Sequence, residues 1–257
     1  MFKNHDGRTN RSHALIAAAL LCIVGCTPAG SDRAIPAQAA DAPGSPATDV
    51  GQDTQRSTTV VMLGDSLTAG YRLAPDEALP SALERRLREQ GLSVTMVNAG
   101  VSGDTTTDAL NRYEFSVAAL NPDLLVIAIG ANDFLNGLDP HKARSNIAQL
   151  LENAREDGIP TALVGLTPPQ KSEPSPDVSQ DFAYGEIYPD LARSYGAPLF
   201  PNLLSRVAGR PELLQDDGLH PTAEGVEAIA EDLTPFLAPL VKAADASQTS
   251  AADLDAM

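Results

Sequence analysis

Hydrophobic positions along this chain fall into blocks of two kinds, which alternate from residue 59 onward. Five blocks are short apolar runs, as expected of strands buried in a parallel sheet, at 59–63, 93–97, 124–129, 161–166 and 198–200. The blocks between them carry apolar residues three and four positions apart, which is the helical period, at 80–91, 104–120, 139–158, 181–195 and 222–240. Strands that alternate with helices predict an α/β fold, a three-layer α/β/α sandwich around a parallel sheet.

The beginning of the chain has a different pattern, which is typical of an export signal. Basic residues precede an apolar stretch at 14–24 that is too short to span a bilayer. The stretch ends in Ile-Val-Gly-Cys26, which resembles the lipobox of bacterial lipoproteins. In that family the cysteine becomes the first mature residue and carries the lipid. An ordinary cleaved signal is the alternative, but it needs a small-x-small site that Ala29-Gly30 matches poorly.

We therefore expect residues 1–25 to be a lipoprotein signal peptide and Cys26 to be lipidated. The exported protein would lie in the periplasm. Thr27 stands where the lipoprotein pattern has an Asp for inner-membrane retention, which favours an anchor in the outer membrane.

Two further segments have compositions that do not predict a packed fold. Residues 26–57 are rich in Ala, Pro and Ser, and they predict a disordered tether because they cannot bury enough apolar surface to offset the entropy of ordering. Residues 243–257 are small and polar, and they predict a flexible tail. One folded domain is left at 58–242. Within it, the Pro- and Ser-rich residues 167–180 predict a loop beside the site, with Phe182 just beyond it.

Charge and residue counts narrow the possible functions. The chain has 18 Lys and Arg against 34 Asp and Glu, a net charge of −16, which excludes the basic surface that nucleic acid binding requires. Of its two cysteines, Cys22 lies in the signal and Cys26 would be acylated, so neither a disulfide nor a cysteine metal site is expected. Only His141 and His220 of the four histidines lie in the domain, and we expect no metal.

The first strand is followed directly by Gly-Asp-Ser66-Leu. A buried strand that ends in a sharp turn presents the next side chain at the carboxyl edge of the sheet, where α/β proteins bind ligands. The side chain presented there is the Ser66 hydroxyl, which is a weak nucleophile unless a base accepts its proton. A serine that only caps the following helix is the alternative interpretation.

His220 is the candidate base, because it follows Asp217 by three residues just before the last predicted helix. The carboxylate could accept a hydrogen bond from one ring nitrogen and leave the other facing Ser66, the arrangement of a serine–histidine–acid triad. His141, at the start of another helix, has no acid placed to orient it and is expected to face water. A surface histidine remains the alternative interpretation of His220.

Two polar stretches follow the second and third predicted strands and would lie at the same edge of the sheet as Ser66. The first contains Gly103, whose N–H can approach a ligand closely, and the second contains Asn132, whose amide is a donor. Acyl transfer through a tetrahedral intermediate needs such donors aimed at the oxyanion. Singly, each is more often a turn or capping residue.

Taken together and in this order, Gly-Asp-Ser66-Leu, Gly103, Gly-x-Asn132-Asp and Asp217-x-x-His220 resemble the SGNH (GDSL) hydrolases. Within that family, residues 59–240 look like the thioesterase I/lysophospholipase/arylesterase group. The resemblance implies a flavodoxin-like fold and a serine esterase without a cofactor. It also implies a small-molecule ester or thioester as substrate, and we expect a monomer.

The resemblance also implies a role for each of these residues. Ser66 would be the nucleophile, His220 the base and Asp217 its partner. The oxyanion hole would consist of the Ser66 and Gly103 N–H groups and the Asn132 amide. Asp65 and Asp133 belong to the same motifs and are interpreted as turn and helix-start residues.

Two other functions are compatible with the same sequence. A carbohydrate O-acetyl esterase would use the same scaffold and the same catalytic residues. A non-catalytic flavodoxin-like module could instead bind a phosphate at the helix that begins at Ser66, although the absence of Trp argues against a flavin.

Overall fold

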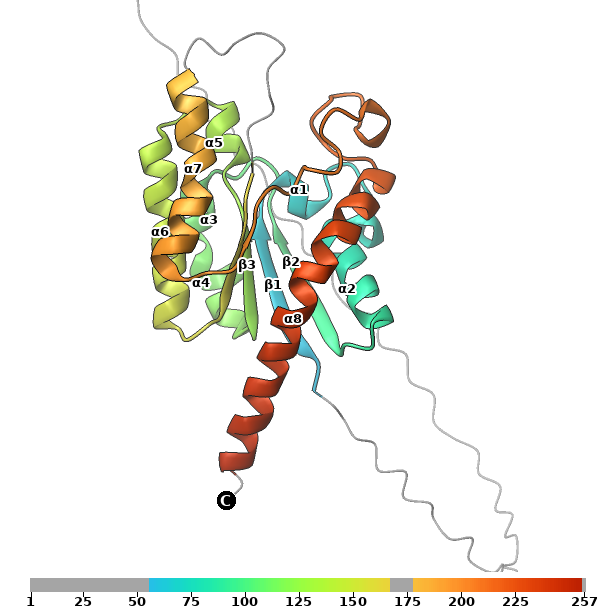
Figure 1. Ribbon diagram of the computed structural model, residues 1–257, viewed down its shortest axis with the longest axis vertical. Helices are drawn as coiled ribbons and strands as arrows, with labels where there is room; N and C mark the ends of the chain where they lie inside the picture. The colour runs from blue at the N-terminus through green and yellow to red at the C-terminus, as the bar shows by residue number, and fades with distance from the viewer. Residues whose placement is uncertain (1–55, 167–177, 256–257) are drawn as a thin grey trace, which may run out of the picture. The chain divides into compact units, whose positions relative to one another are not determined.

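The computed structural model describes residues 56–166 and 178–255, and within these the side chains of 178–183 and 249–255 are not described (Figure 1). The predicted signal peptide with Cys26, nearly all of the tether, residues 167–177 of the predicted loop and the side chain of Phe182 therefore lie outside the described residues.

A five-stranded sheet forms the centre of the domain, and all of its neighbouring strands are parallel. Its order is β2-β1-β3-β4-β5, the flavodoxin-like order, which confirms the predicted fold class. The strands are β1 (Thr58–Gly64), β2 (Val94–Gly100), β3 (Leu124–Ala128), β4 (Thr161–Val164) and β5 (Leu199–Phe200). All five overlap the predicted runs. Every residue of β3 is buried, as its unbroken apolar sequence predicts for a strand covered on both faces.

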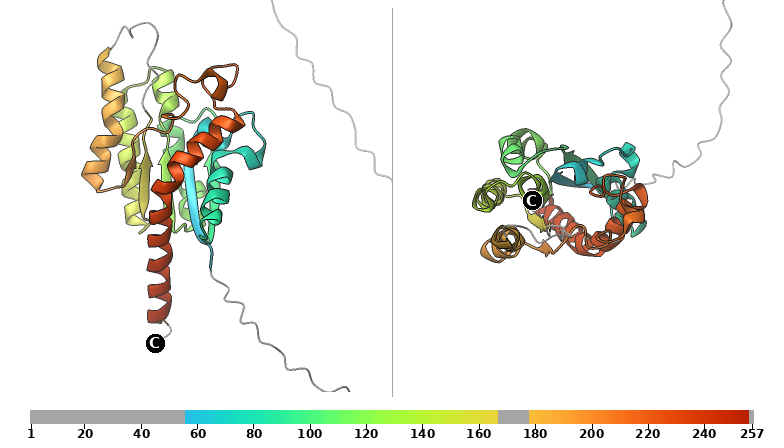
Figure 2. Two further views of the ribbon diagram at one scale, coloured as in Figure 1. Left: turned by 45° about the vertical axis from the view of Figure 1, so that its right-hand side comes forward. Right: turned by 90° about the horizontal axis from the view of Figure 1, so that it is seen from above.

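Helices cover both faces of this sheet (Figure 1). On one face α2 (Leu79–Glu89) packs against α8 (Ala223–Asp255). On the other face α6 (Pro140–Glu156) packs against α3 (Thr106–Asn111) and α7 (Val178–Tyr195). Figure 2 shows the same layers from two further directions. None of the described helices combines the length and apolar composition needed to cross a membrane.

Two helical predictions were wrong in extent. The single helix predicted at 104–120 is three short pieces, α3, α4 (Tyr113–Ser116) and a 3-10 turn at Ala118–Leu120. The apolar period identified the buried side chains Ala109, Tyr113 and Val117, but such a period does not record a change of backbone direction between them.

The last helix was predicted to end at 240, with a tail from 243, yet α8 continues to Asp255. Its extension is rich in Ala and has no Gly or Pro after Pro239, so nothing in the sequence ends the helix. Val241 and Ala244 are buried, which extends the packed domain slightly beyond residue 242. The flexibility of the remaining residues stays a prediction.

Short helices follow the carboxyl ends of the central strands. The sequence analysis anticipated a helix start at Ser66 and at Asp133 but gave neither helix any bounds, because one turn is too short to show a period. They are α1 (Ser66–Ala69) after β1 and α5 (Ala131–Leu135) after β3. Further 3-10 turns lie at Pro75–Glu77 and Pro211–Leu213.

Helix α1 lies unusually close to the strand ends, and two glycines make this possible. Gly64 and Gly100 are paired at the ends of β1 and β2. A Cβ at Gly64 would lie 2.0 Å from Thr68 Oγ1, and one at Gly100 would lie 2.3 Å from Ala69 N. The two glycines therefore let the first turn of α1 lie directly on the sheet edge, and Ser66 begins that turn.

Candidate active site

Ser66 is held in a tight turn between β1 and α1. Asp65 caps the helix, and its Oδ1 accepts a hydrogen bond of 3.0 Å from the Leu67 N–H. This confirms the interpretation of Asp65 as a turn residue. Its side chain is fully buried, and Oδ2 has no hydrogen-bond partner among the described residues. Burial raises the pKa of Asp65 to about 6, because a carboxylate loses its hydration there.

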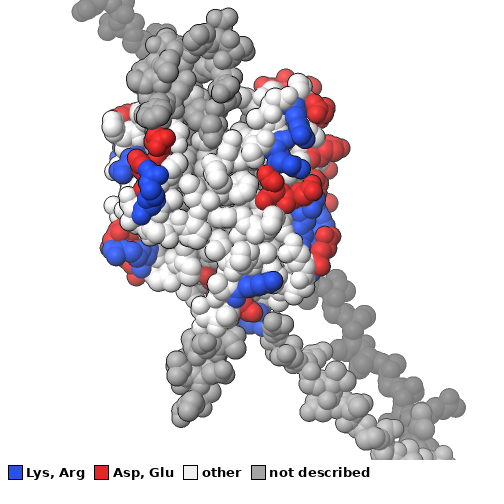
Figure 3. Space-filling view, viewed as in Figure 1, with Lys and Arg blue, Asp and Glu red and all other residues white. Residues whose placement is uncertain are grey.

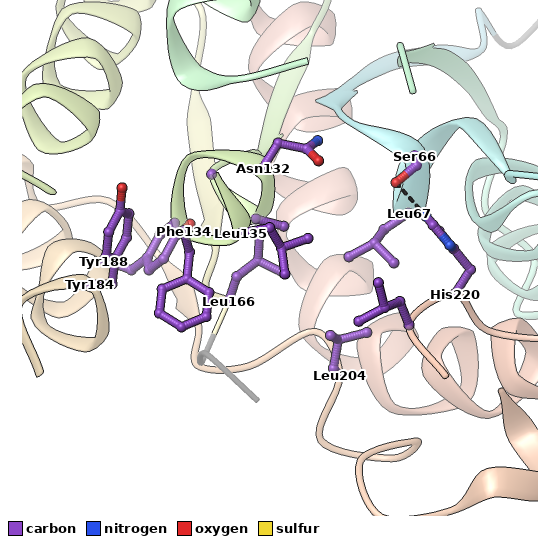
Figure 4. A pocket seen from close by; sticks show the side chains of 13 residues that line it. Ser66, Leu67, Asn132, Phe134, Leu135, Leu166, Tyr184, Tyr188, Leu204 and His220 are labelled. Carbon is purple, nitrogen blue, oxygen red and sulfur yellow. Dashed lines mark hydrogen bonds between the residues drawn. The ribbon is translucent and has the colours of Figure 1, made fainter. Parts of the chain in front are cut away.

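His220 lies against Ser66 although 154 positions separate them in the chain. Its Nε2 is 2.8 Å from Ser66 Oγ, the contact drawn as a dashed line in Figure 4. Its Nδ1 is 2.8 Å from Asp217 Oδ2. An ionised carboxylate only accepts hydrogen bonds, so Nδ1 carries the proton and Nε2 is free to accept the Ser66 proton. Serine, histidine and acid thus form one hydrogen-bonded series.

Asp217 is fixed by the backbone as well as by the imidazole. Its Oδ1 accepts from the N–H groups of His220 at 3.0 Å and Leu219 at 2.9 Å. These backbone hydrogen bonds, and then the bond to the ring, lower the pKa of Asp217 to about 2. The carboxylate therefore stays ionised, and it fixes the ring's tautomer, across the whole neutral range.

The turn that carries His220 is tied to α1 by two residues that the sequence analysis did not identify. Gln215 Nε2 donates to the carbonyl oxygens of Tyr71 and Pro221, both at 2.8 Å. The Tyr71 ring lies beside the imidazole, with 4.4 Å between centroids. Gln215 stands next to the acidic motif, but neither residue has a pattern in the sequence that would mark its role. His141 is exposed on α6, as predicted.

The structure places the three predicted oxyanion donors differently with respect to the cavity. Asn132, on α5, lies across from Ser66 with its amide directed toward it (Figure 4), and both residues line one cavity. Gly103 lies in the turn after β2 at a φ of +92°, where a side chain would be strained, and it does not line that cavity. Among the described residues, neither the Ser66 nor the Gly103 N–H donates to a backbone carbonyl, so both can serve a ligand.

A buried network of hydrogen bonds fixes the residue next to Asn132 in α5. The neighbouring Asp133 accepts from the Thr106 N–H at 2.7 Å and from its hydroxyl at 2.6 Å. Asn146, on α6, donates to the same hydroxyl at 3.0 Å. Asp133 was interpreted only as a helix-start residue. The structure shows that it also joins α5 to α3.

The cavity beside Ser66 has a volume of about 240 Å³ and mostly apolar walls. Its lining comes from the segments that follow β1, β3, β4 and β5, and it includes Leu67, Phe134, Leu166, Tyr184, Tyr188 and Leu204 (Figure 4). The tyrosine hydroxyls are bound to backbone oxygens, Tyr184 to Leu138 and Tyr188 to Ile129, which leaves their rings to face the cavity. Such a pocket suits an apolar chain better than a sugar or a phosphate.

The residues that the structure describes contain no cluster of three or more His, Cys, Asp or Glu side chains able to hold a metal ion. What the described site does bring together is a serine hydroxyl beside an imidazole, a carboxylate on the other ring nitrogen, and an amide directed toward the same hydroxyl.

Comparisons with known proteins agree with this geometry. The sequence profile of the GDSL-like Lipase/Acylhydrolase family matches residues 62–228. An arylesterase of Vibrio mimicus is 36% identical over 179 residues, 69% of this chain and 87% of that protein. The thioesterase 1/protease 1/lysophospholipase L1 of Escherichia coli strain K12 is 31% identical over 183 residues, 71% of this chain and 85% of that protein. Among solved structures, the SGNH-hydrolase family esterase AlinE4 is 38% identical with a TM-score of 0.60, over 72% of this chain and 97% of that chain.

Proposed function

The chain belongs to the GDSL-like lipase/acylhydrolase family, and on this premise we propose that Ser66, His220 and Asp217 carry out its ester hydrolysis through an acyl-enzyme intermediate. That it is a serine hydrolase of ester bonds follows from its family and relatives, which rules out the non-catalytic binding module. The observation that carries the residue assignment is the unbroken series of 2.8 Å contacts from Ser66 Oγ through His220 to Asp217.

Acylation begins when Ser66 Oγ attacks the carbonyl carbon of the ester and His220 Nε2 takes the hydroxyl proton. The imidazolium that forms is stabilised by Asp217, whose low pKa keeps it charged. When the tetrahedral intermediate collapses, the C–O or C–S bond to the leaving group breaks. His220 then gives its proton to the departing alcohol or thiol, and the acyl group remains on Ser66 Oγ.

Water completes the reaction by the same steps. It loses a proton to His220 Nε2 as its oxygen attacks the acyl carbon, and the proton returns to Ser66 Oγ as the carboxylic acid leaves. In both halves the negative charge on the carbonyl oxygen is met by the Ser66 and Gly103 N–H groups and by the Asn132 amide.

The substrate class that we propose comprises aryl esters, acyl thioesters and lysophospholipids with an acyl chain that enters the apolar cavity. Support comes from the lining of that cavity and from the names of the relatives. Burial of each methylene contributes about 0.8 kcal/mol, which is enough to select for chain length. A carbohydrate O-acetyl esterase gains little support, because an acetyl group would leave most of this cavity unfilled.

Two measurements test this proposal. The first is intact-protein mass spectrometry after reaction with an alkyl phosphonate ester, which should add one phosphonyl group to wild type and none to Ser66→Ala. The second is kcat/KM across p-nitrophenyl esters of increasing acyl length, which should rise from acetate to a longer ester before it falls. Labelling that persists without Ser66 would overturn the nucleophile assignment, and a maximum at acetate would overturn the substrate class.

We also propose that the protein is exported and held at the outer membrane as a monomer by a lipid on Cys26. The support is the lipobox-like sequence and the tether-like composition of residues 26–57. Such a spacer would let the domain reach substrates some distance from the membrane surface.

A further inference from the structure

Arg112, at the junction of α3 and α4, connects two segments that both carry parts of the site. Its Nη2 donates to the Gly64 carbonyl oxygen at 2.9 Å, at the end of β1 and two residues before Ser66. Its Nε lies 2.6 Å from Asp104 Oδ2, in the turn after β2. The side chain of Arg112 is 18% exposed and that of Asp104 13%, so the pair is largely removed from water.

Asp104 connects this ion pair to the oxyanion donors. It follows Gly103 directly, so the position of its side chain constrains the peptide beside the Gly103 N–H. Its carbonyl oxygen accepts a hydrogen bond of 2.9 Å from Asn132 Nδ2. An amide nitrogen has two hydrogens, so this bond holds the amide in place and leaves the second hydrogen for a ligand.

We propose that Arg112 and Asp104 are a positioning pair that sets the distances among the three oxyanion donors. Through Gly64 the guanidinium fixes the strand end that leads to Ser66, and through Asp104 it fixes Gly103 and Asn132. The pair touches neither the substrate nor the reacting atoms. The inference rests on the proposed function, because it takes those three groups as the oxyanion hole.

The hydrogen bond from Arg112 to the Gly64 carbonyl oxygen is not needed to give that oxygen a partner. Val101 N–H already donates to the Gly64 carbonyl oxygen at 3.1 Å, so the end of β1 keeps a partner without Arg112. The guanidinium donates from two different nitrogens, one to Asp104 and one to Gly64. Lysine has a single nitrogen and cannot reproduce that geometry. Preorganised donors stabilise a transition state only when their spacing is held, and a displacement of about 1 Å can cost roughly 10²-fold in rate.

The test uses Arg112→Lys, which retains the charge but not the fork, and Asp104→Asn, which retains the backbone acceptor but not the ion pair. Each variant should lower kcat on a p-nitrophenyl ester by about 10- to 100-fold, with KM changed by less than about threefold. Melting temperature measures folding in the same samples. Arg86→Lys is the matched control, because Arg86 pairs with Glu227 between α2 and α8, away from the cavity. It should leave kcat unchanged.

A double-mutant comparison separates positioning from a general loss of structure. If the pair acts through the oxyanion hole, Arg112→Lys should reduce kcat much less in an Asn132→Ala background than in wild type. An equal loss in both backgrounds, an unchanged kcat in the single variants, or unfolding of both single variants would overturn the proposal. Ser66→Ala, assayed in parallel, reports on the proposed function independently, because activity that survives it would refute the nucleophile whatever Arg112 does.

Discussion

At the scale of single residues, two aspartates of this site show how burial and hydrogen bonding shift a carboxyl pKa in opposite directions. Asp65 is fully buried beside the nucleophile, and loss of hydration raises its pKa to about 6. Asp217 accepts two backbone N–H groups and the imidazole, which lowers its pKa to about 2. Near neutral pH Asp217 is therefore charged at little cost, whereas the charge on Asp65 opposes folding.

This difference predicts how the stability of the protein depends on pH. Asp65 has a folded pKa above its unfolded value of 3.8, so its favourable contribution is complete below about pH 4 and is lost as the pH rises through about 6. The cost of ionisation at pH 8 is on the order of 3 kcal/mol. Asp65→Asn keeps an acceptor for the Leu67 N–H but cannot ionise. The unfolding free energy of this variant minus that of wild type should therefore be larger at pH 8 than at pH 4.

Urea unfolding of both proteins at pH 4 and pH 8 measures this change in the difference between their unfolding free energies. Asp76→Asn, a change at an exposed carboxylate of a 3-10 turn, is the control and should follow wild type. If the unfolding free energy of Asp65→Asn changed with pH as much as that of wild type does, the charge on Asp65 would not oppose folding. Asp217 acts with the opposite sign, because its contribution is present above about pH 4 and is lost as the pH falls toward 2.

A second prediction at this scale concerns Asn132. Its amide is directed toward Ser66 and is held by Asp104, whereas the buried connections between α5 and α3 belong to Asp133. Asn132→Ala should therefore lower kcat by about 10²- to 10³-fold and leave KM and the melting temperature nearly unchanged. Steady-state kinetics and a thermal scan on one preparation give all three values. A loss confined to KM would make Asn132 a substrate-binding residue instead.

Single residues also mark the limit of what the sequence could predict about the site. Ser66 and Asn132 were found because each belongs to a short motif directly after a strand, and Asp217 and His220 because they form a motif just before the last helix. The structure brings these side chains together. Their roles in the reaction stay a proposal. Arg112 and Gln215 were missed, because each acts through partners that are distant in the sequence, and a lone arginine or glutamine has no motif.

At the scale of elements, the contact of α1 with the sheet edge is the feature on which the site depends. A methyl group at Gly64 would lie 2.0 Å from Thr68 Oγ1 and 2.7 Å from the Ala128 carbonyl oxygen. Gly64→Ala should therefore force α1 away from β1 and cost about 1–3 kcal/mol of stability. Activity should fall by more than this loss explains, since Ser66 moves with the helix.

A second glycine provides the matched comparison. Gly185 lies within α7, and a Cβ there would meet no heavy atom within 4 Å beyond its chain neighbours and the backbone of its own helix. Gly185→Ala should stabilise the protein by about 0.5–1 kcal/mol, because alanine has less backbone entropy to lose in a helix. Thermal unfolding of the two variants against wild type tests the pair. A melting temperature for Gly64→Ala equal to that of wild type would contradict the close contact of α1.

The sequence predicted elements well where burial alone determines them. All the strands were placed. β3 is buried at every residue and β1 at all but one, as unbroken apolar runs predict, whereas β2 and β5 are only partly buried and were recognised from short apolar runs between predicted helices. The alternation with helices then implied the sheet's fold class. The break of the 104–120 helix at Arg112 was not predictable, because the bonds from Arg112 to Gly64 and Asp104 are tertiary. The end of α8 was misplaced because a small, polar composition is compatible with both a helix and a tail.

At the scale of the whole molecule, the chain carries a net charge of −16, yet the face shown in Figure 3 is not continuously acidic. On the face shown in Figure 3, acidic and basic side chains lie side by side along both flanks, with uncharged residues between them. Arg85 and Arg86 pair with Glu227 across α2 and α8. Opposite charges therefore lie close enough on this face to offset one another in part.

The proposed anchor is also a property of the whole molecule. Lipidation of Cys26 would hold the full chain in the membrane fraction, and Cys26→Ala should release it to the soluble periplasmic fraction with its activity retained. Fractionation of cells that express each form, followed by esterase assay and immunoblot, measures this. Ser45→Ala in the predicted tether is a control that should stay with the membrane. Equal soluble recovery of wild type and Cys26→Ala would refute the anchor.

Ser66 and His220 should act as one catalytic unit, and a double-mutant comparison tests this most directly. Ser66→Ala and His220→Ala should each reduce kcat by several orders of magnitude, because the hydroxyl is not reactive without a base and the base has no other nucleophile to activate. The measurement is kcat for wild type, both single variants and the double variant on one p-nitrophenyl ester. We predict that the double variant is about as active as either single variant. Losses that multiply in the double variant would show that the two side chains act independently and would contradict the account.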